Sequence, residues 1–187
     1  MNEWHPGYVK ANGISIHYHR TGGAKPALLL LHGITDNGLC WTRFARDLEQ
    51  RYDILMPDAR GHGSSQGVSS GFTEVILADD AAGVITALGL ERPFVFGHSM
   101  GAATAARLAA AYPELVRAIL LEDPPYAEVT PLTGEGMRGF RQEIITLKGL
   151  PGPERIARVS AENPGWHALE IGATAQAKAE VDLAIFE

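Results

Sequence analysis

The sequence predicts an α/β fold in which a mostly parallel, doubly wound sheet is followed by a helical segment. Three observations carry this prediction. Short apolar runs typical of buried strands recur through residues 1–125 and alternate with helical patterns. Asn12-Gly13 between two alternating runs is typical of a hairpin turn. Beyond Pro125, segments rich in Gly and Pro separate short amphipathic patterns, and no strand-like run recurs. We therefore expect a sheet-based core over 1–125 and a helical segment over 126–187.

The individual elements follow from their hydrophobic periodicity. The expected strands are the hairpin runs 8–11 and 14–19, the apolar runs 27–31, 53–57 and 90–96, and a last run at 116–121. The expected helices are 41–51, 72–88 and 100–111 in the core, and 140–147, 154–159 and 173–183 in the C-terminal segment. Strands that alternate with helices give parallel pairing, so loops at the carboxyl ends of the strands should form the site.

Composition excludes several classes of function. The chain has 187 residues, of which 45% are hydrophobic, and its net charge is −6, so it lacks the basic footprint of a nucleic-acid or membrane-surface binder. Cys40 is the only cysteine, so an intramolecular disulfide is not possible. The N-terminus has no secretory signal pattern, and the apolar runs are too short to span a bilayer. We expect a cytoplasmic protein.

The chemistry is centred on the motif Gly97-His98-Ser99-Met100-Gly101. An apolar strand run precedes it and a run of small helix formers follows, which predicts a strand, a very tight turn and a helix. The two glycines would let strand and helix approach closely, with Ser99 on the strained corner. Its hydroxyl would then stand at the carboxyl end of the sheet, beside the free N–H groups of a helix N-terminus.

In this context the chain resembles the α/β-hydrolase superfamily, in its serine-nucleophile, esterase- and lipase-like branch with a helical cap. Two further segments carry the resemblance. His32-Gly33-Ile34 follows a central strand, as in the oxyanion loop of the family, and the segment beginning at Asp58 matches its Asp-x-Arg-Gly-x-Gly-x-Ser loop. The resemblance implies that 126–187 is part of the cap, and that the chain stops before the last strands of the family.

The resemblance also implies a serine hydrolase that cleaves an ester-like bond of a small-molecule substrate through an acyl-enzyme on Ser99. The backbone N–H groups of Ile34 and Met100 would hold the oxyanion. Serine at this position argues against the epoxide hydrolase and haloalkane dehalogenase branches, which need aspartate there. The same machinery also serves lactones, thioesters, amides and certain carbon–carbon bonds, and the cap would select among them.

The acid and the base of the triad are not both assigned by the sequence. In the family the order is Ser, acid, His, with the histidine after the final strand. His167 is the only histidine after Ser99 and is therefore a candidate base, with a surface or packing role as the alternative. Asp123 ends the last expected strand and is the candidate acid, with simple Asp-Pro-Pro turn chemistry as the alternative.

Other polar residues near these motifs are expected to have structural roles. We expect His32 to brace the oxyanion loop, and His62 not to act as a base. Asp58 and Arg60 are expected to fix their loop through an ion pair and hydrogen bonds.

Two pairs of titratable residues lie outside these motifs. His17 and His19 should share a solvent-facing side of a strand. Asp79 and Asp80 diverge by about 100° on a helix, so we expect a solvated face or a loop brace rather than paired acid–base chemistry. The sequence contains no H-x-x-x-H, cysteine pair, phosphate loop or dinucleotide fingerprint, and we expect neither a metal nor another cofactor.

Two explanations fit the short chain. It is a fragment of a longer hydrolase, or it is a working protein whose unpaired sheet edge makes it a homo-oligomer. Two other functions compete with hydrolysis: a non-catalytic ligand-binding protein, and an interaction module derived from a hydrolase. The intact Ser99 motif favours catalysis, whereas the missing family histidine favours binding.

Overall fold

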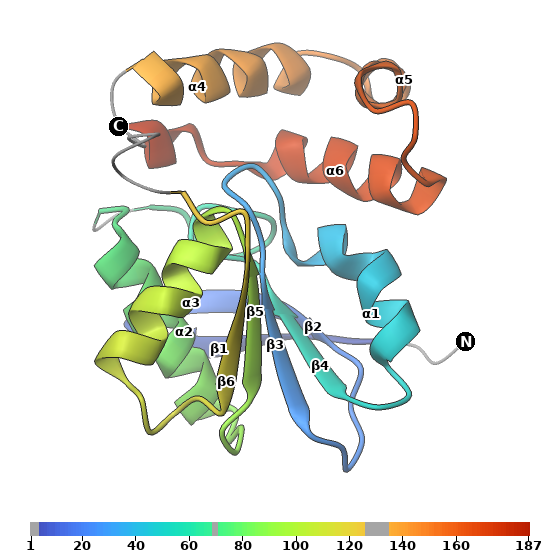
Figure 1. Cartoon of the computed structure of the whole chain (residues 1–187). Helices are drawn as coiled ribbons and strands as arrows, with labels where there is room; N and C mark the ends of the chain where they lie inside the picture. Colours follow the sequence, from blue (N-terminus) through green and yellow to red (C-terminus); the bar gives the residue numbers. More distant parts are fainter. Residues whose placement is uncertain (1–3, 69–70, 126–134) are drawn as a thin grey trace.

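Six strands form one sheet in a computed structural model that describes residues 4–68, 71–125 and 135–187 (Figure 1). The strands are β1 (His5–Ala11), β2 (Ile14–Arg20), β3 (Ala27–Leu31), β4 (Asp53–Pro57), β5 (Phe94–His98) and β6 (Ala118–Glu122). Their order is β1-β2-β4-β3-β5-β6. β1 and β2 form the antiparallel hairpin, β2 pairs antiparallel with β4, and the remaining pairs are parallel. The predicted fold class is therefore confirmed.

Helices cover both faces of the sheet. The 3-10 turn η1 (Gly38–Trp41) and α1 (Thr42–Leu48) lie on one face, and α2 (Glu74–Ala87) and α3 (Met100–Ala111) lie on the other (Figure 1). β3 shows why its sequence is continuously apolar. Leu29 packs in the cluster beneath α2 and α3 and Leu30 packs in the cluster beneath α1, and neither is exposed. A strand buried on both faces needs an apolar side chain at every position.

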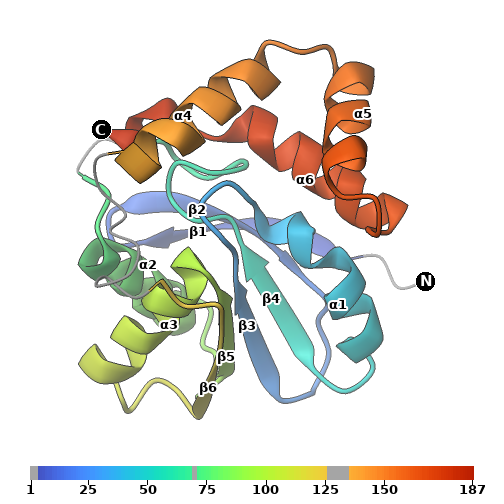
Figure 2. The same cartoon turned by 45° about the horizontal axis from the view of Figure 1, so that its top comes forward.

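The C-terminal helices lie across the carboxyl ends of the parallel strands (Figures 1 and 2). They are α4 (Glu135–Lys148), α5 (Gly152–Glu162), α6 (Ala168–Glu180) and the 3-10 turn η2 (Leu183–Phe186). α6 contacts η1 and α1, and η2 contacts α4. Ile144 of α4 and Ile185 of η2 share an apolar cluster with Ile34 and Met100 of the core. The boundary expected after residue 125 falls at residues 126–134, outside the described residues.

Some element boundaries differ from the sequence expectation for local reasons. The helix expected from residue 41 begins as η1, because the Asn37 side chain accepts a hydrogen bond from the Leu39 N–H at 3.0 Å and starts a tighter turn. α6 begins at Ala168, five residues before the expected start. His167 and Glu170 form a capping box there. The Glu170 carboxylate accepts from the His167 N–H, and Nδ1 of His167 accepts from the Leu169 N–H. In the described part of the chain, no helix is both long and apolar enough to cross a membrane.

β6 is an exposed edge strand. All five of its residues are exposed, and Leu120 retains 59% of its accessible surface. Beside it, a groove of about 340 Å³ is lined by aromatic residues such as Phe44, Phe94 and Phe96. An apolar strand with a free hydrogen-bonding edge is the feature on which the expectation of a homo-oligomer rests.

Candidate active site

Ser99 occupies the strained corner between β5 and α3. Its backbone has φ 51° and ψ −116°, a conformation that non-glycine residues rarely adopt. The Ser99 N–H donates to the carbonyl of Glu122 at 2.9 Å, which joins the corner to β6. A Cβ atom on Gly97 would lie 2.1 Å from the Gly101 carbonyl oxygen, so the strand and the helix approach as closely as the motif predicts.

Two backbone N–H groups stand close to this corner. Met100 is the first residue of α3, so its N–H has no acceptor within the helix. Ile34 lies in the loop after β3, and within the described residues its N–H has no hydrogen-bond acceptor. Ile34 and Met100 also pack in one apolar cluster, which keeps the loop and the helix start together. The arrangement can offer two donors to one oxygen atom.

His32 braces the loop through both ring nitrogens. Nδ1 lies 2.8 Å from the carbonyl oxygen of Gly33, and Nε2 accepts from the Ala59 N–H at 2.9 Å. Because Nε2 accepts, the proton of the neutral ring is on Nδ1. Only 3% of His32 is exposed, so the ring has no free nitrogen for proton transfer.

His62 is also fully occupied. Its ring nitrogens lie 2.9 Å from the carbonyl oxygen of Arg60 and 2.5 Å from that of Ile34, and the side chain is completely buried. Burial, reinforced by nearby His32, lowers the pKa of His62 to about 4. The neutral ring carries one N–H, so it donates to one of these two carbonyl oxygens while it packs against the Ile34 peptide.

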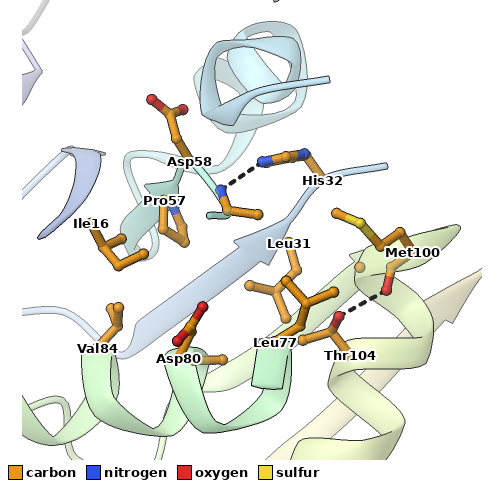
Figure 3. Close-up of a pocket in the computed structure, with 13 residues that line it drawn as sticks. Ile16, Leu31, His32, Pro57, Asp58, Leu77, Asp80, Val84, Met100 and Thr104 are labelled. Atoms are coloured by element: carbon orange, nitrogen blue, oxygen red, sulfur yellow. Dashed lines mark hydrogen bonds between the residues drawn. The ribbon is translucent and has the colours of Figure 1, made fainter. Parts of the chain in front are cut away.

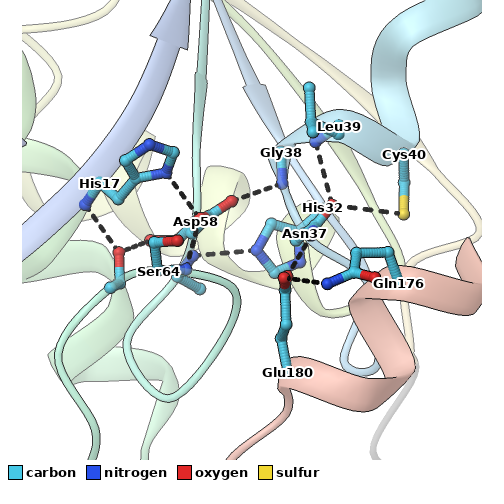
Figure 4. A network of polar contacts seen from close by, with 12 residues as sticks. His17, His32, Asn37, Gly38, Leu39, Cys40, Asp58, Ser64, Gln176 and Glu180 are labelled. Atoms are coloured by element: carbon cyan, nitrogen blue, oxygen red, sulfur yellow. Dashed lines mark hydrogen bonds and ion pairs between the residues drawn. The ribbon is translucent and has the colours of Figure 1, made fainter. Parts of the chain in front are cut away.

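Asp58 is the centre of the polar network in Figure 4. Its carboxylate lies 2.8 Å from Nδ1 of His17 and accepts from the N–H groups of Gly38 at 2.8 Å and Ser64 at 2.9 Å. Burial works against its charged form, but these hydrogen bonds outweigh that effect, and the pKa of Asp58 is lowered. The expectation that His17 faces solvent is wrong. The residue is only 8% exposed, because its ring turns toward Asp58 and bonds to that carboxylate. Its ring does share a side with that of His19, 4.8 Å away.

Arg60 pairs with Asp80 rather than with Asp58. Nε and Nη2 of Arg60 each donate to an Asp80 oxygen at 2.6 Å, and the two residues are only 1% and 5% exposed. Asn12 donates to the same carboxylate at 2.8 Å. Asp80 is therefore a loop brace on α2, one of the two roles expected for it. Asp79 points elsewhere and accepts from the Tyr112 hydroxyl at 2.7 Å.

The loop after β3 is tied to α6 above it. Asn37 donates from its amide to Glu180 at 2.9 Å, and Gln176 donates to the other oxygen of the same carboxylate at 2.6 Å (Figure 4). Lys178 donates to the Thr35 hydroxyl at 3.2 Å. No local sequence pattern indicates the contacts of Asn37 and Thr35 with α6, because the partners are 143 residues apart.

The two remaining triad candidates differ in position. β5 and β6 pair His98 with Glu122, so the next residues, Ser99 and Asp123, leave the same edge of the sheet side by side. Asp123 is also held at a positive φ of 47°. His167 instead caps α6, where its Nδ1 accepts from the Leu169 N–H at 3.2 Å. Among the described residues, the Ser99 hydroxyl has no hydrogen-bond partner.

Each of the two neighbours of Ser99 in the chain, His98 and Met100, lines a cavity. One of about 230 Å³ is lined by His98, Glu122, Asp36 and two tryptophans, Trp41 and Trp166. The other, about 500 Å³, is lined by Ile34 and Met100 together with residues of α2, α4 and η2. The pocket in Figure 3 lies beneath Met100 between β3 and α2, and at about 40 Å³ it is too small for a substrate.

Cys40 lies at the first of these cavities but is not an activated nucleophile. Burial and the nearby Asp36 carboxylate raise the pKa of its thiol. The thiolate, which is the reactive form of cysteine, is therefore disfavoured.

The fold and the corner define a class of protein. Residues 26–151 match the family model of the alpha/beta hydrolase fold, and the chain belongs to this family.

Individual relatives are hydrolases. The chain is 37% identical over 139 residues to N-formylmaleamate deformylase of Pseudomonas putida, covering 74% of this chain and 50% of that protein. It is 37% identical over 114 residues to 2-(acetamidomethylene)succinate hydrolase of Mesorhizobium japonicum, covering 60% and 41%. A crystal structure of E-2-(acetamidomethylene)succinate hydrolase superposes with a TM-score of 0.80 at 27% identity, covering 94% of this chain and 64% of that one. The chain thus spans about half the length of the curated relatives it matches. Other relatives are named an epoxide hydrolase and a fluoroacetate dehalogenase, so members act on different bonds.

Proposed function

We propose that the protein is a serine hydrolase that cleaves an ester-like carbonyl bond of a small molecule through an acyl-enzyme on Ser99. The observation that carries the proposal is the conformation of Ser99, a non-glycine residue with a positive φ. Gly97 and Gly101, on either side of it in the motif, lie so close to neighbouring backbone that neither position has room for a Cβ atom. Backbone strain of this kind persists only where the surrounding structure enforces it, and it is typical of catalytic corners.

In the proposed reaction, the Ser99 hydroxyl oxygen attacks the substrate carbonyl while a base takes its proton. The N–H groups of Ile34 and Met100 donate to the resulting oxyanion, and His32 and His62 hold the loop that presents Ile34. The tetrahedral intermediate expels the leaving group, which takes up the proton held by the base. Water then attacks the acyl-enzyme by the same route and releases the carboxylic acid and Ser99.

Asp123 is the proposed acid that orients the base. Its place beside Ser99 at the sheet edge supports this role, because a carboxylate there can reach a histidine that also reaches Ser99. The base itself is a histidine, and His167 is the candidate in this chain. Its Nδ1 already serves α6, so it would need to act through Nε2.

A non-catalytic ligand-binding protein is the second candidate function. It is favoured by one observation: within the described residues no histidine hydrogen-bonds to Ser99, and the two histidines nearest the oxyanion loop, His32 and His62, have both ring nitrogens engaged. In that case the cavities would hold a small molecule without turnover.

A fluorophosphonate probe separates the two candidates. We expect intact-mass analysis to show one covalent adduct per chain, absent from Ser99→Ala and retained in Ser160→Ala, a serine variant on α5. The same variants should behave alike in hydrolysis of p-nitrophenyl butyrate, with Ser99→Ala lowering the rate at least 100-fold. A folded protein that takes up no probe would refute the hydrolase and leave the binding protein.

A further inference from the structure

The larger cavity is placed to receive part of a ligand held at Ser99. Its lining comes from the N-terminal ends of α2 and α3 and from α4 and η2. Figures 1 and 2 show how these elements are arranged. Its volume of about 500 Å³ is within the range of small-molecule sites. Ile34 and Met100, the two proposed oxyanion donors, both line it. Most of its wall is apolar, with Phe72, Leu77, Met137, Ile185 and Phe186.

Arg141 breaks the pattern of that wall. Met137, Arg141 and Ile144 are spaced i, i+4, i+7 and therefore share one side of α4. Met137 and Ile144 pack in the apolar cluster beneath the helix, and Ile144 is fully buried. Arg141 lies between them and is half-buried, whereas its neighbours Gln142 and Glu143 are exposed. A cation thus occupies the core-facing stripe of an amphipathic helix.

The charges around the cavity favour an anion near Arg141. The charged residues that line it are Glu74, Arg138, Arg141 and Glu187. Arg138 already takes part in an interaction, whereas Arg141 has no hydrogen bond or ion pair within the described residues. α2 and α3 also begin at this cavity, so the positive ends of their helix dipoles lie beside it. The carboxylate of Glu74 offsets part of the positive potential at the start of α2. A guanidinium in an apolar wall binds a carboxylate more strongly than one in open water does.

We propose that Arg141 is a specificity-determining residue that binds a carboxylate on the acyl part of the substrate. The substrate class is then a short acyl compound with a free carboxylate remote from the scissile carbonyl, such as a monoester or monoamide of a dicarboxylic acid. The proposal rests on the proposed function for the position of the scissile bond at Ser99. The carboxylate contact itself is assigned to Arg141, because a planar guanidinium matches the two carboxylate oxygens in a way that glutamine cannot.

The test compares an anionic with a neutral ester. We expect Arg141→Gln to lower the ratio of kcat/KM for p-nitrophenyl hemisuccinate over p-nitrophenyl butyrate by about 10- to 100-fold, and Arg141→Lys to restore part of it. Arg158→Gln, which changes an exposed arginine on α5, should leave the ratio within about twofold. An unchanged ratio in Arg141→Gln would overturn the proposal.

Equilibrium binding keeps this test separate from that of the proposed function. If neither ester is hydrolysed, the hydrolase proposal fails, but the subsite is still tested by NMR titration of succinate into the wild-type chain. We expect saturable binding with a Kd that rises at least fivefold in Arg141→Gln and not in Arg158→Gln. Absence of succinate binding, or equal affinity in wild type and Arg141→Gln, would overturn the assignment whether or not the chain is an enzyme.

Discussion

Replacing Asp80 by asparagine should lower the free energy of unfolding by about 3–5 kcal/mol, because it leaves a buried guanidinium without its counter-charge. Arg60 and Asp80 are 1% and 5% exposed and are joined by two parallel hydrogen bonds of 2.6 Å. At this burial the solvent cannot replace the lost carboxylate. Asn12, which donates to the same group, loses part of its own interaction. The loss would be a large share of the total stability of a domain this size.

Urea unfolding followed by far-UV circular dichroism measures this loss directly. The matched control is Arg158→Ala, which removes an ion pair with Glu162 whose side chains are 60% and 45% exposed, and no measurable change is expected there. The double variant Arg60→Met/Asp80→Leu should recover part of the stability lost in Asp80→Asn, since neither charge is then buried alone. A loss below about 1 kcal/mol in Asp80→Asn would refute the reasoning that the pair is desolvated.

Two further predictions concern the site. Gly101→Ala should destabilise the chain by about 1–3 kcal/mol, because its Cβ would lie 2.1 Å from the Leu31 carbonyl oxygen. Thermal melting tests this beside the control Gly139→Ala, where a Cβ meets nothing within 4 Å. Equal melting temperatures of the two variants would contradict the prediction. His62 should make stability fall as the pH falls, because its pKa of about 4 in the folded chain is below the ordinary value of 6.5, so the unfolded chain binds the proton first. Between pH 7 and pH 5 its contribution is about 2 kcal/mol, and urea titrations at both values should show a smaller loss in His62→Gln than in wild type; equal losses would count against it.

The sequence predicted the parts of the fold that depend on local pattern. Continuous apolar runs such as Ala27–Leu31 gave strands buried on both faces, and the Gly97 to Gly101 motif gave a strained turn, because steric exclusion at the glycines is a local property. The expectation that His32 braces its loop agrees with the contacts of both its ring nitrogens, and both nitrogens of His62 also lie against loop carbonyl oxygens.

The side-chain pairings between segments far apart in the chain could not be predicted from the sequence. Arg60 was expected to pair within its own loop, and it pairs with Asp80 because α2 packs against that loop. His17 was expected to face solvent, but β2 lies next to β4, which ends immediately before Asp58, and this neighbour was not visible in any periodicity. Arg141 stands between Met137 and Ile144 at helical spacing, but the cavity that this stripe lines is built from segments far apart in the sequence.

The contacts between α6 and the loop after β3 make the two a single thermodynamic unit. Asn37 supports the first turn of η1 with its side-chain oxygen and holds Glu180 with its amide, so lifting α6 removes a constraint from the loop that carries Ile34. Thermodynamic linkage makes this coupling reciprocal. If docking of α6 onto the loop changes the free energy of ligand binding at Ile34, then ligand binding changes the free energy of α6 docking by the same amount. Hydrogen exchange at the amides of α6 would therefore report whether a ligand occupies the site at the loop after β3.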